Sequence, residues 1–497
     1  MRTCGVLMPV SSLAGRYGIG GFGQEAYDFV DFLEAAGQGL WQILPLGPTG
    51  YGDSPYQSCS AFAGNPYFID PALLVKDGLL EEAELRELEA PCTDRIDYGR
   101  LYQTRYPMLR RACAAFAQKR AQGDEVAEDY QEFLEKNWDW LEDYVLYRAA
   151  QKKNDMKPWQ QWPEDLRCRQ PEALDTLRRE MGEELDFWRF VEYMFSRQWK
   201  ALREYADEKH VKILGDMPIY VSMDSSDAWA GRELFETDED GEPTRVAGCP
   251  PDYFCQDGQF WGNPLYDWEY HKKTGYEWWL RRIRRALERY DLVRIAHFRA
   301  FDTYWSIPAE AETAREGKWM EGPGLPFFET VREKLGDLPL VAEDLGDLFE
   351  SVRVLLRGTG LPGMKVLQFA FSHPGNEYLP HFHIPNCLVY TGTHDNNTLR
   401  GWLEQDASPE QKQFAKAYLG VKDDRDLPEA ILRAALASCG DTCVIPLADW
   451  LGLGAEARIN TPGVVGPNWA WRTVETRWSP ELARRMRDTC GLYARVR

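Results

Sequence analysis

The stretch VKILGDM, at residues 211–217, is a short apolar run that ends in a charged region. Seven more runs of this kind, rich in Val, Ile or Leu, are spread along the chain. They cover residues 5–10, 40–46, 292–296, 339–343, 364–371, 387–393 and 442–447. Runs of this length are typical of strands that are buried on both faces of a parallel sheet.

Helical patterns separate these runs. After the first run, Ala26, Phe29, Val30 and Leu33 recur at the spacing of one apolar helix face. Residues 276–290 predict another helix, with a basic outer side between Arg281 and Arg289. Strands that alternate with helices favour a parallel sheet, and eight of them predict the α/β class and a (β/α)8 TIM barrel.

Two connections are too long for plain strand–helix units. Residues 47–210, between strands two and three, hold a loop-rich piece and then long helical stretches. Residues 218–290, between strands three and four, begin with a turn-rich aromatic segment. We expect both to be insertions on the C-terminal face of the barrel, where binding loops lie. The whole chain, residues 1–497, is expected to form a single catalytic unit.

The composition excludes some partners. The 497 residues carry a net charge of −21, so nucleic acid and anionic membranes are unfavourable partners. The chain contains no apolar stretch long enough to span a bilayer, and its N-terminal apolar stretch is too short for a signal peptide. The eleven cysteines include no CxxC pair, which indicates reduced thiols in a cytoplasmic protein. The 19 Trp residues fill a core or form platforms for sugar rings, and composition alone does not distinguish the two.

Polar residues follow several of the predicted strands. Asp216 ends strand three, Glu343 ends strand five, and Asp395 follows strand seven. In a TIM barrel the strand ends carry the catalytic groups, and paired carboxyls are the equipment for cleaving glycosidic bonds. The alternative for each residue alone is that it caps a neighbouring helix. Three carboxyls on one face favour chemistry.

Long stretches of the chain resemble the amylomaltase (disproportionating enzyme) family of 4-α-glucanotransferases, almost from end to end. The stretches that carry the resemblance are PTGYGDSPYQSCSAFAGNPYFID (48–70), ILGDMPIYV (213–221), PPDYFCQDGQFWGNPLYDW (250–268), VRIAHFRAF (293–301), VAEDLG (341–346), YTGTHDNNT (390–398) and INTPGVVGPNWAWR (459–472).

This resemblance implies an interrupted (β/α)8 barrel of the α-amylase-like kind. It also implies cleavage of the α-1,4 bonds of maltodextrins and amylose with retention, without a cofactor. It implies a glucosyl-enzyme ester and transfer of the glucan to another sugar. Glu343 matches the general acid/base, and Asp395 matches the carboxylate that stabilises the transition state. The nucleophile should be an Asp directly before His297, but that position is Ala296.

A methyl group has no lone pair and no charge, so Ala296 cannot form the ester. Retaining chemistry needs two carboxyls about 5–5.5 Å apart, and one of them is missing. The sequence therefore predicts a transferase site that is disabled at its nucleophile but still binds glucan. A deliberate replacement and a naturally inactive protein both fit, and the surviving partner groups favour the first.

The resemblance also implies residues that bind sugar. Tyr56 matches an aromatic near the bond to be cleaved, and Asp216 contacts a sugar hydroxyl or the motif arginine, unless both serve only in packing. Trp261 and Asn263 lie in a loop that favours a sugar acceptor over water. The remaining expected glucan contacts are Ser54, Arg294, His297, His394 and Asn468.

Two further patterns do not indicate sites. The GIGGFG stretch at 18–23 satisfies GxGxxG, but it does not follow a strand directly, so we expect a turn beside the sugar cleft. His381 and His383 alternate without a third ligand, so we expect a surface loop and no metal site.

Two rival functions remain open. The first is an α-amylase-like hydrolase, in which water replaces the acceptor sugar. The second is a maltodextrin-binding protein without turnover, which only Ala296 favours.

Overall fold

The computed structural model describes residues 2–50, 52–91, 93–251, 256–346, 348–464, 466–474 and 478–496. Of the stretches quoted above, residues 51, 252–255 and 465 lie outside the described residues. Among the described helices, none is long and apolar enough to cross a membrane.

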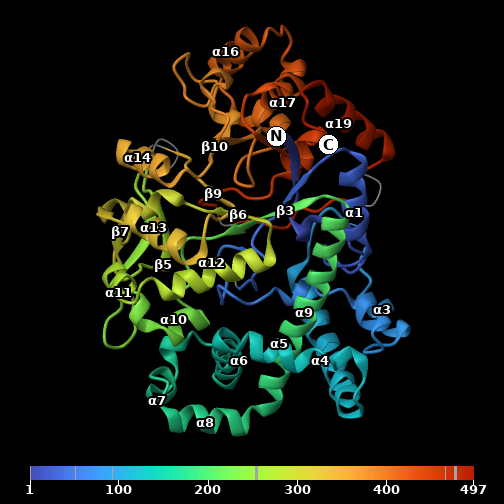
Figure 1. Ribbon diagram of the computed structural model, residues 1–497, viewed down its shortest axis with the longest axis vertical. Helices are drawn as coiled ribbons and strands as arrows, with labels where there is room; N and C mark the ends of the chain where they lie inside the picture. The colour runs from blue at the N-terminus through green and yellow to red at the C-terminus, as the bar shows by residue number, and fades with distance from the viewer. Residues whose placement is uncertain are drawn as a thin grey trace.

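Eight parallel strands form the centre of the molecule (Figure 1). They are β1 (Thr3–Leu7), β2 (Leu40–Gln42), β3 (Lys212–Met217), β6 (Leu292–Ile295), β9 (Leu340–Ala342), β10 (Gly363–Val366), β11 (Cys387–Tyr390) and β12 (Thr442–Pro446). Each of these eight strands pairs with the next in this order except β9 with β10, and β12 pairs with β1. The Ala342 amide donates to Pro362 O at 2.9 Å, which joins β9 to the start of β10 and closes the barrel.

The barrel confirms the predicted fold class, and all eight predicted runs contain a strand. The strands are shorter than the runs. The run 364–371 continues past β10 into a 3-10 turn at Leu367–Phe369, because the chain leaves the sheet there and remains buried in the loops above it.

Nineteen helices are found in the described residues. They are α1 (Gln24–Ala35), α2 (Pro71–Lys76), α3 (Glu82–Leu88), α4 (Tyr98–Gln122), α5 (Tyr130–Lys136), α6 (Trp138–Lys153), α7 (Glu164–Arg167), α8 (Pro171–Glu180), α9 (Gly182–Glu208), α10 (Ser226–Ala230), α11 (Trp268–Lys273), α12 (Glu277–Arg289), α13 (Gly324–Leu335), α14 (Glu350–Thr359), α15 (Leu399–Gly401), α16 (Pro409–Leu419), α17 (Leu427–Ala437), α18 (Leu447–Trp450) and α19 (Pro480–Leu492). Helices α4 to α8 lie together at one end of the molecule and α16 lies at the other, whereas the two termini lie close together near α17 and α19 (Figure 1).

A second, four-stranded antiparallel sheet was not predicted. Its order is β5 (Gln259–Pro264), β4 (Arg245–Cys249), β7 (Thr303–Pro308) and β8 (Lys318–Glu321). The central pair, β4 and β7, joins segments on either side of β6. The two strands are far apart in the sequence, so no local sequence pattern predicted that they would pair.

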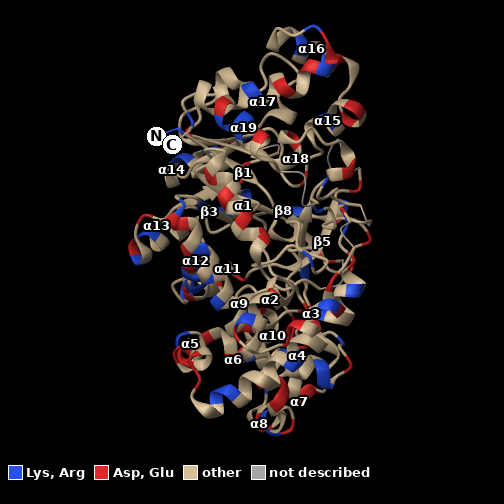
Figure 2. Ribbon diagram, turned by 90° about the vertical axis from the view of Figure 1, so that its right-hand side faces the viewer, with Lys and Arg blue, Asp and Glu red and all other residues tan. Residues whose placement is uncertain are grey.

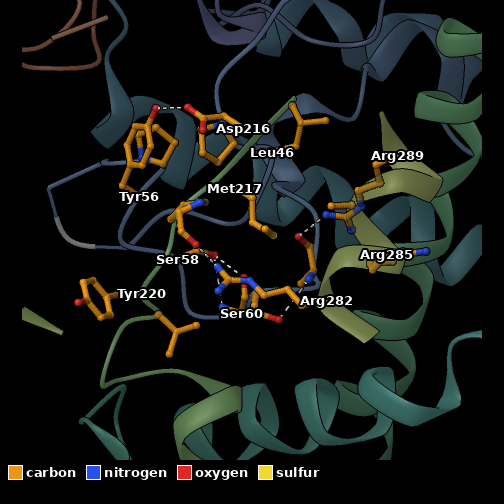
Figure 3. A pocket seen from close by; sticks show the side chains of 18 of the residues that line it. Leu46, Tyr56, Ser58, Ser60, Asp216, Met217, Tyr220, Arg282, Arg285 and Arg289 are labelled. Carbon is orange, nitrogen blue, oxygen red and sulfur yellow. Dashed lines mark hydrogen bonds between the residues drawn. The ribbon is translucent and has the colours of Figure 1, made fainter. Parts of the chain in front are cut away.

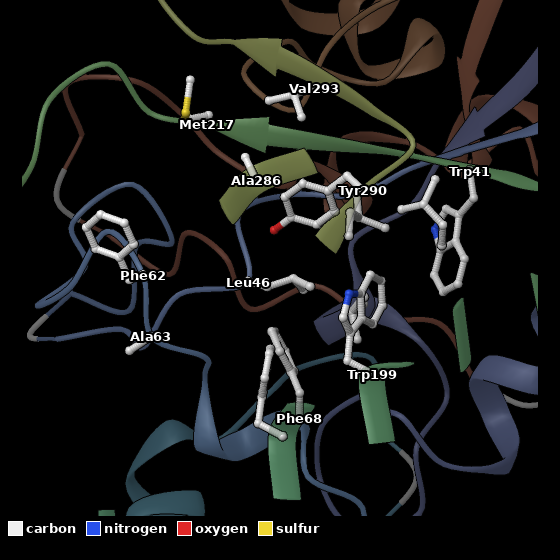
Figure 4. Packing of buried hydrophobic residues seen from close by; sticks show 14 of the residues in the cluster. Trp41, Leu46, Phe62, Ala63, Phe68, Trp199, Met217, Ala286, Tyr290 and Val293 are labelled. Carbon is white, nitrogen blue, oxygen red and sulfur yellow. The ribbon is translucent and has the colours of Figure 1, made fainter. Parts of the chain in front are cut away.

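The long helix α9 packs against the barrel through large side chains. Trp199 lies beside Phe68, Leu46 and Tyr290 in this core (Figure 4). The Trp199 indole donates to Arg289 O at 3.0 Å. A Cβ at Gly215 on β3 would come within 2.2 Å of the Tyr290 ring, so only glycine allows this close approach.

The predicted basic outer side of α12 is wrong in part. Arg282 and Arg289 are buried, with exposed fractions of 4% and 8%. Arg282 donates to Ile219 O at 2.9 Å, and Arg289 donates to Ala63 O at 3.2 Å. Both side chains satisfy loop carbonyls that no helix or strand partner reaches, which a helical charge pattern does not reveal. Elsewhere, acidic and basic residues are intermingled on the outer helices (Figure 2).

A buried carboxyl pair lies where the first loop enters α1. Glu25 accepts from the Gly21 amide at 2.9 Å, and a Cβ at Gly23 would collide with both Glu25 and Asp70. Burial and then the Asp70 charge raise the pKa of the Glu25 carboxyl to about 7. Arg105 opposes both effects.

We expect the free energy of unfolding to fall as pH rises from about 4.5 to above 7. The folded pKa of Glu25 is raised, so its contribution is complete at low pH and is lost as the carboxyl ionises. Glu25→Gln should remove on the order of 2–3 kcal/mol of this pH dependence. Urea unfolding across this pH range measures it, with Glu34→Gln on the exposed side of α1 as the control. An equal slope in both variants would contradict the prediction.

Candidate active site

The strand ends of the barrel surround a cavity of about 350 Å³. All the predicted site residues line it except Asp216, which lies beneath it. Those in the lining are Ser54, Tyr56, Trp261, Asn263, Arg294, Ala296, His297, Glu343, His394, Asp395 and Asn468. The fold therefore brings together Arg294 on β6 and residues that follow β2, β6, β9, β11 and β12. Trp261 and Asn263, which we expected in a loop, lie on strand β5 of the four-stranded sheet, because that segment pairs with β4.

Arg294 is the electrostatic centre of this cavity. Strand register places it directly beside Asp216, because β3 and β6 pair at these two residues. Its Nη1 donates to both Asp216 oxygens at 2.7 and 2.6 Å, and its Nη2 donates to Glu343 Oε2 at 2.6 Å. The two carboxylates raise the pKa of Arg294, so the guanidinium remains charged despite its burial.

Glu343 follows β9 and faces Arg294. The His297 amide also donates to Glu343 Oε2, at 2.8 Å, and His297 has a left-handed backbone with φ 55°. Burial raises the pKa of Glu343 above its usual value, and the Arg294 charge and the His297 amide oppose this rise. A carboxyl with a raised pKa, at the wall of a cavity, keeps its proton to a higher pH than a solvent-exposed glutamate and can serve as a general acid.

Ala296 contributes only a methyl group to the cavity wall. The residue is 9% exposed, and its amide donates to Met217 O at 3.0 Å. The neighbouring Arg294 Nε is buried and has no hydrogen-bond partner in the described part of the chain. A carboxyl on Ala296 would stand within the same cavity lining as Arg294 and Glu343.

Asp395 is held by residues that the sequence analysis missed. Asn460 Nδ2 donates to Asp395 Oδ1 at 2.6 Å, and Arg458 Nη2 donates to Asp395 O at 2.9 Å. Arg458 Nε in turn donates to Asn460 O at 2.8 Å. Asn460 lies within the quoted stretch 459–472. Its position as a polar residue after the eighth strand was the feature of the sequence that could have marked it as a site residue. The other oxygen of Asp395, Oδ2, lies 3.4 Å from His394 Nε2, and the side chain is 45% exposed, so a ligand in the cavity can reach it.

Tyr56 forms an aromatic wall beside these carboxylates. Its ring stacks on His394 at 5.0 Å with an interplanar angle of 16°, and Trp469 lies 5.6 Å away. Its hydroxyl donates to Asp216 Oδ2 at 2.6 Å. The Asp216 interaction therefore connects Tyr56 to Arg294 as well.

The two histidines of the cavity are neutral. Burial lowers the pKa of His297 to about 3, and burial likewise lowers the pKa of His394. His297 packs edge-on against Trp261, with ring centroids 5.0 Å apart. Neutral imidazoles can donate and accept hydrogen bonds from hydroxyls without adding charge.

Three of the predicted contacts use their polar atoms to shape the walls. Asn263 Nδ2 donates to Val221 O at 2.7 Å, and Ser54 Oγ accepts from the Tyr56 amide at 3.2 Å. Asn468 accepts from the Thr461 amide at 3.0 Å and donates to Val464 O at 3.0 Å. Asn468 thus holds the loop above the cavity, and its amide is largely committed to that loop.

A smaller cavity of about 60 Å³ lies beneath Tyr56 and Asp216 (Figure 3). Arg282 and Arg289 reach into its surroundings from α12. The inward turn of these side chains, which the sequence analysis placed outside, therefore supports the floor of the larger cavity.

The two discounted patterns lie elsewhere. Residues 18–23 form the turn before α1 and do not line the larger cavity. His381 lies in a 3-10 turn and contacts Tyr418 Oη at 2.9 Å. The expected surface position is wrong for His383, which is 7% exposed and contacts Ser438 Oγ at 2.6 Å. Within the described residues, no group of His, Cys, Asp or Glu is arranged to hold a metal ion.

Comparison with known proteins identifies the family. The family model described as 4-alpha-glucanotransferase matches residues 8–476. The chain belongs to the 4-α-glucanotransferase family. It is 44% identical to the 4-alpha-glucanotransferase of Clostridium butyricum, over 98% of this chain and 100% of that protein. It is 45% identical to that of Thermus thermophilus, over 98% of this chain and 97% of that protein.

The fold of this 4-α-glucanotransferase family member matches a solved amylomaltase structure. The amylomaltase from Streptococcus agalactiae, in complex with acarbose, is 39% identical, and each chain is covered to 100%. The TM-score of 0.96 shows that the barrel and its insertions have the same arrangement in both proteins. The amylomaltase resemblance noted from the sequence is thereby confirmed.

We expect Asn460→Ala to weaken the binding of maltotetraose to this chain by about three- to tenfold, because Asp395 loses a charge-assisted hydrogen bond worth about 1 kcal/mol. Titration calorimetry measures the change. Asn386→Ala is the control, since it also removes one side-chain amide hydrogen bond, which Asn386 donates to a backbone carbonyl outside the cavity. Unchanged affinity in Asn460→Ala would show that Asn460 does not help to hold Asp395 for the ligand.

Proposed function

We propose that this chain binds α-1,4-glucans in the 350 Å³ cavity and that Ala296 occupies the position of the catalytic nucleophile, so that glucan transfer stops before the covalent step. The observation that carries the proposal is the placement of the Ala296 methyl in one cavity wall with Arg294 and Glu343. The acarbose complex of the related amylomaltase supports an α-glucan as the ligand.

The proposed roles follow from the geometry. Glu343 holds the proton that the leaving sugar oxygen needs, since its pKa is raised by burial. Arg294, fixed by Asp216, orients Glu343 through the contact of its Nη2 with Glu343 Oε2. Asp395, held by Asn460, accepts hydrogen bonds from sugar hydroxyls and steadies positive charge on the ring.

The remaining contacts would position the glucan. Tyr56 offers the face of its ring for packing against a sugar, and Trp261 lies on the side of the cavity where the acceptor sugar would bind. The neutral imidazoles of His297 and His394 would form hydrogen bonds with sugar hydroxyls. A retaining transfer then needs a nucleophile on the opposite face of the sugar from Glu343. The methyl side chain of Ala296 cannot act as this nucleophile, so the bound glucan remains intact.

Incubation with maltotriose tests this function. We expect this chain to leave maltotriose intact and Ala296→Asp to produce glucose together with a ladder of longer maltodextrins, both read by chromatography. Glucose and maltose without longer products would indicate a hydrolase. If both proteins are folded and neither acts, the leading function becomes that of a maltodextrin-binding protein, which Ala296 also favours.

A further inference from the structure

The cavity wall at Ala296 combines a fixed positive charge with a small apolar surface. Arg294 is held in place by Asp216, and its Nη2 by Glu343, whereas its buried Nε–H donates to no group among the described residues. Formate consists of the same carboxylate group that an aspartate side chain carries, with a hydrogen in place of the Cβ. Ala296, Arg294 and Glu343 line the same cavity of about 350 Å³, which gives a carboxylate-sized anion room near the guanidinium.

We propose that the wall formed by Ala296, Arg294 and Glu343 is a binding site for a small carboxylate-like anion, and that the bound anion acts as an exchangeable nucleophile for glucan cleavage. This inference rests on the proposed function. It adds an activity that the side chains of this protein do not supply alone: transfer of a glycosyl group to, and through, a diffusible anion.

The first step balances as a substitution. An oxygen of formate attacks the anomeric carbon of the bound glucan from the face opposite the scissile oxygen. The carbon–oxygen bond breaks, its electron pair stays with the leaving oxygen, and Glu343 gives that oxygen its proton. The products are a β-glycosyl formate ester and a glucan with a free 4-hydroxyl, with no change in oxidation state.

The second step reverses these roles. The ionised Glu343 takes the proton from the 4-hydroxyl of an acceptor sugar, whose oxygen attacks the anomeric carbon and forms an α-1,4 bond. Formate leaves with the electron pair of its ester bond and returns to solution. Azide could replace formate as the nucleophile in the first step. The resulting β-glycosyl azide should accumulate, because azide is a poor leaving group.

Local charge allows this binding but limits its strength. Asp216 is neutralised by its two contacts with Arg294, and Glu343 is neutral when it carries its proton. Asp395 remains as a nearby carboxylate, and the whole chain carries a net charge of −21. Both disfavour anions, so we expect weak binding that needs formate at high concentration.

The test uses the full chain with maltotetraose, and sodium formate at molar concentration against sodium chloride at the same ionic strength. We expect formate to raise the formation of longer maltodextrins by about 100-fold over chloride, a partial recovery of what a missing nucleophile costs. In a parallel reaction, sodium azide should give a β-glycosyl azide detectable by mass spectrometry and proton NMR.

A variant that fills the wall provides the control. Ala296→Leu should abolish the formate and azide effects, because the larger side chain takes the space beside Arg294, while calorimetry with maltotetraose checks that it still binds glucan. Binding itself is read without turnover: the carbon-13 line of labelled formate should broaden with this chain and not with Ala296→Leu.

The outcomes separate this inference from the proposed function. Suppose that Ala296→Asp is active, but that the carbon-13 line of formate does not broaden, formate does not accelerate the formation of longer maltodextrins, and azide gives no adduct. The anion site is then refuted and the proposed function stands. An equal formate effect in Ala296→Leu would also refute the site. If Ala296→Asp is folded and inactive, the proposed function fails and this inference fails with it.

Discussion

Ala296→Asp should raise the rate of maltotriose disproportionation by about 10⁴-fold or more, since removal of a catalytic nucleophile costs up to about 10⁶-fold in a well-studied protease. The cavity wall already holds the partners that such a carboxylate requires. Arg294 supplies a fixed positive charge with an unused buried N–H in the described structure, and Glu343 supplies the proton. Initial rates from chromatography of the products measure the gain.

Ala296→Asn is the matched control for this gain. It has nearly the same shape as Ala296→Asp but no negative charge, so it cannot form a stable glycosyl ester. A comparable rate in both variants would show that the gain comes from packing and not from a nucleophile. No gain in a folded Ala296→Asp protein would remove position 296 from the mechanism.

The same substitution should change the acid/base. A carboxylate at position 296 would add a negative charge near Glu343, and like charges disfavour ionisation. We therefore expect the pKa of Glu343 to be lower in this chain than in Ala296→Asp. NMR titration of a labelled Glu343 carboxyl compares the two, and an unchanged or higher value in this chain would contradict the expectation.

Arg294→Met should lower the free energy of unfolding by about 3–5 kcal/mol, because it leaves buried carboxylates without their counter-charge. Asp216 has a fully buried side chain and accepts two hydrogen bonds from Arg294 and one from the Tyr56 hydroxyl, of which only Arg294 brings a positive charge. Glu343 loses its ion pair as well. Urea unfolding, followed by tryptophan fluorescence, measures the loss.

Two comparisons identify the cause. The loss should shrink as pH falls, because the unpaired carboxyls can then take up protons inside the folded protein. Adding Asp216→Asn to Arg294→Met should recover part of the lost stability, since it removes one of the unpaired charges. If the loss of unfolding free energy in Arg294→Met is equal at all pH values and is unaffected by Asp216→Asn, its cause is lost packing and not the unpaired charges.

Much of the fold could be predicted because burial leaves a local trace in the sequence. The run 211–217 and its seven counterparts are apolar on both faces, as strands covered by helices on one side and filled on the other must be. The stripe of α1, including Ala26, Phe29 and Leu33, is fully buried as its spacing predicted. The β4–β7 pairing could not be predicted, because its two strands are far apart in the chain and neither has a strong pattern.

The site divides in the same way. Residues at strand ends, such as Asp216, Glu343 and Asp395, could be singled out because a barrel brings its strand ends together on one face. Their partners could not: the ion pair of Glu343 with Arg294 and the hydrogen bond of Asn460 to Asp395 depend on side-chain directions across neighbouring loops. The direction of Arg282 and Arg289 was misjudged for the same reason.

The order of residues along the chain by itself determined the barrel, the strand ends that carry chemistry, and the presence of a methyl at position 296. Only the tertiary structure decided what surrounds that methyl. Register between β3 and β6 sets Asp216 beside Arg294, and the pairing of β6 with β9 brings Glu343 to the same guanidinium. Contacts of this kind join segments that local sequence patterns do not relate, so three-dimensional packing alone establishes them.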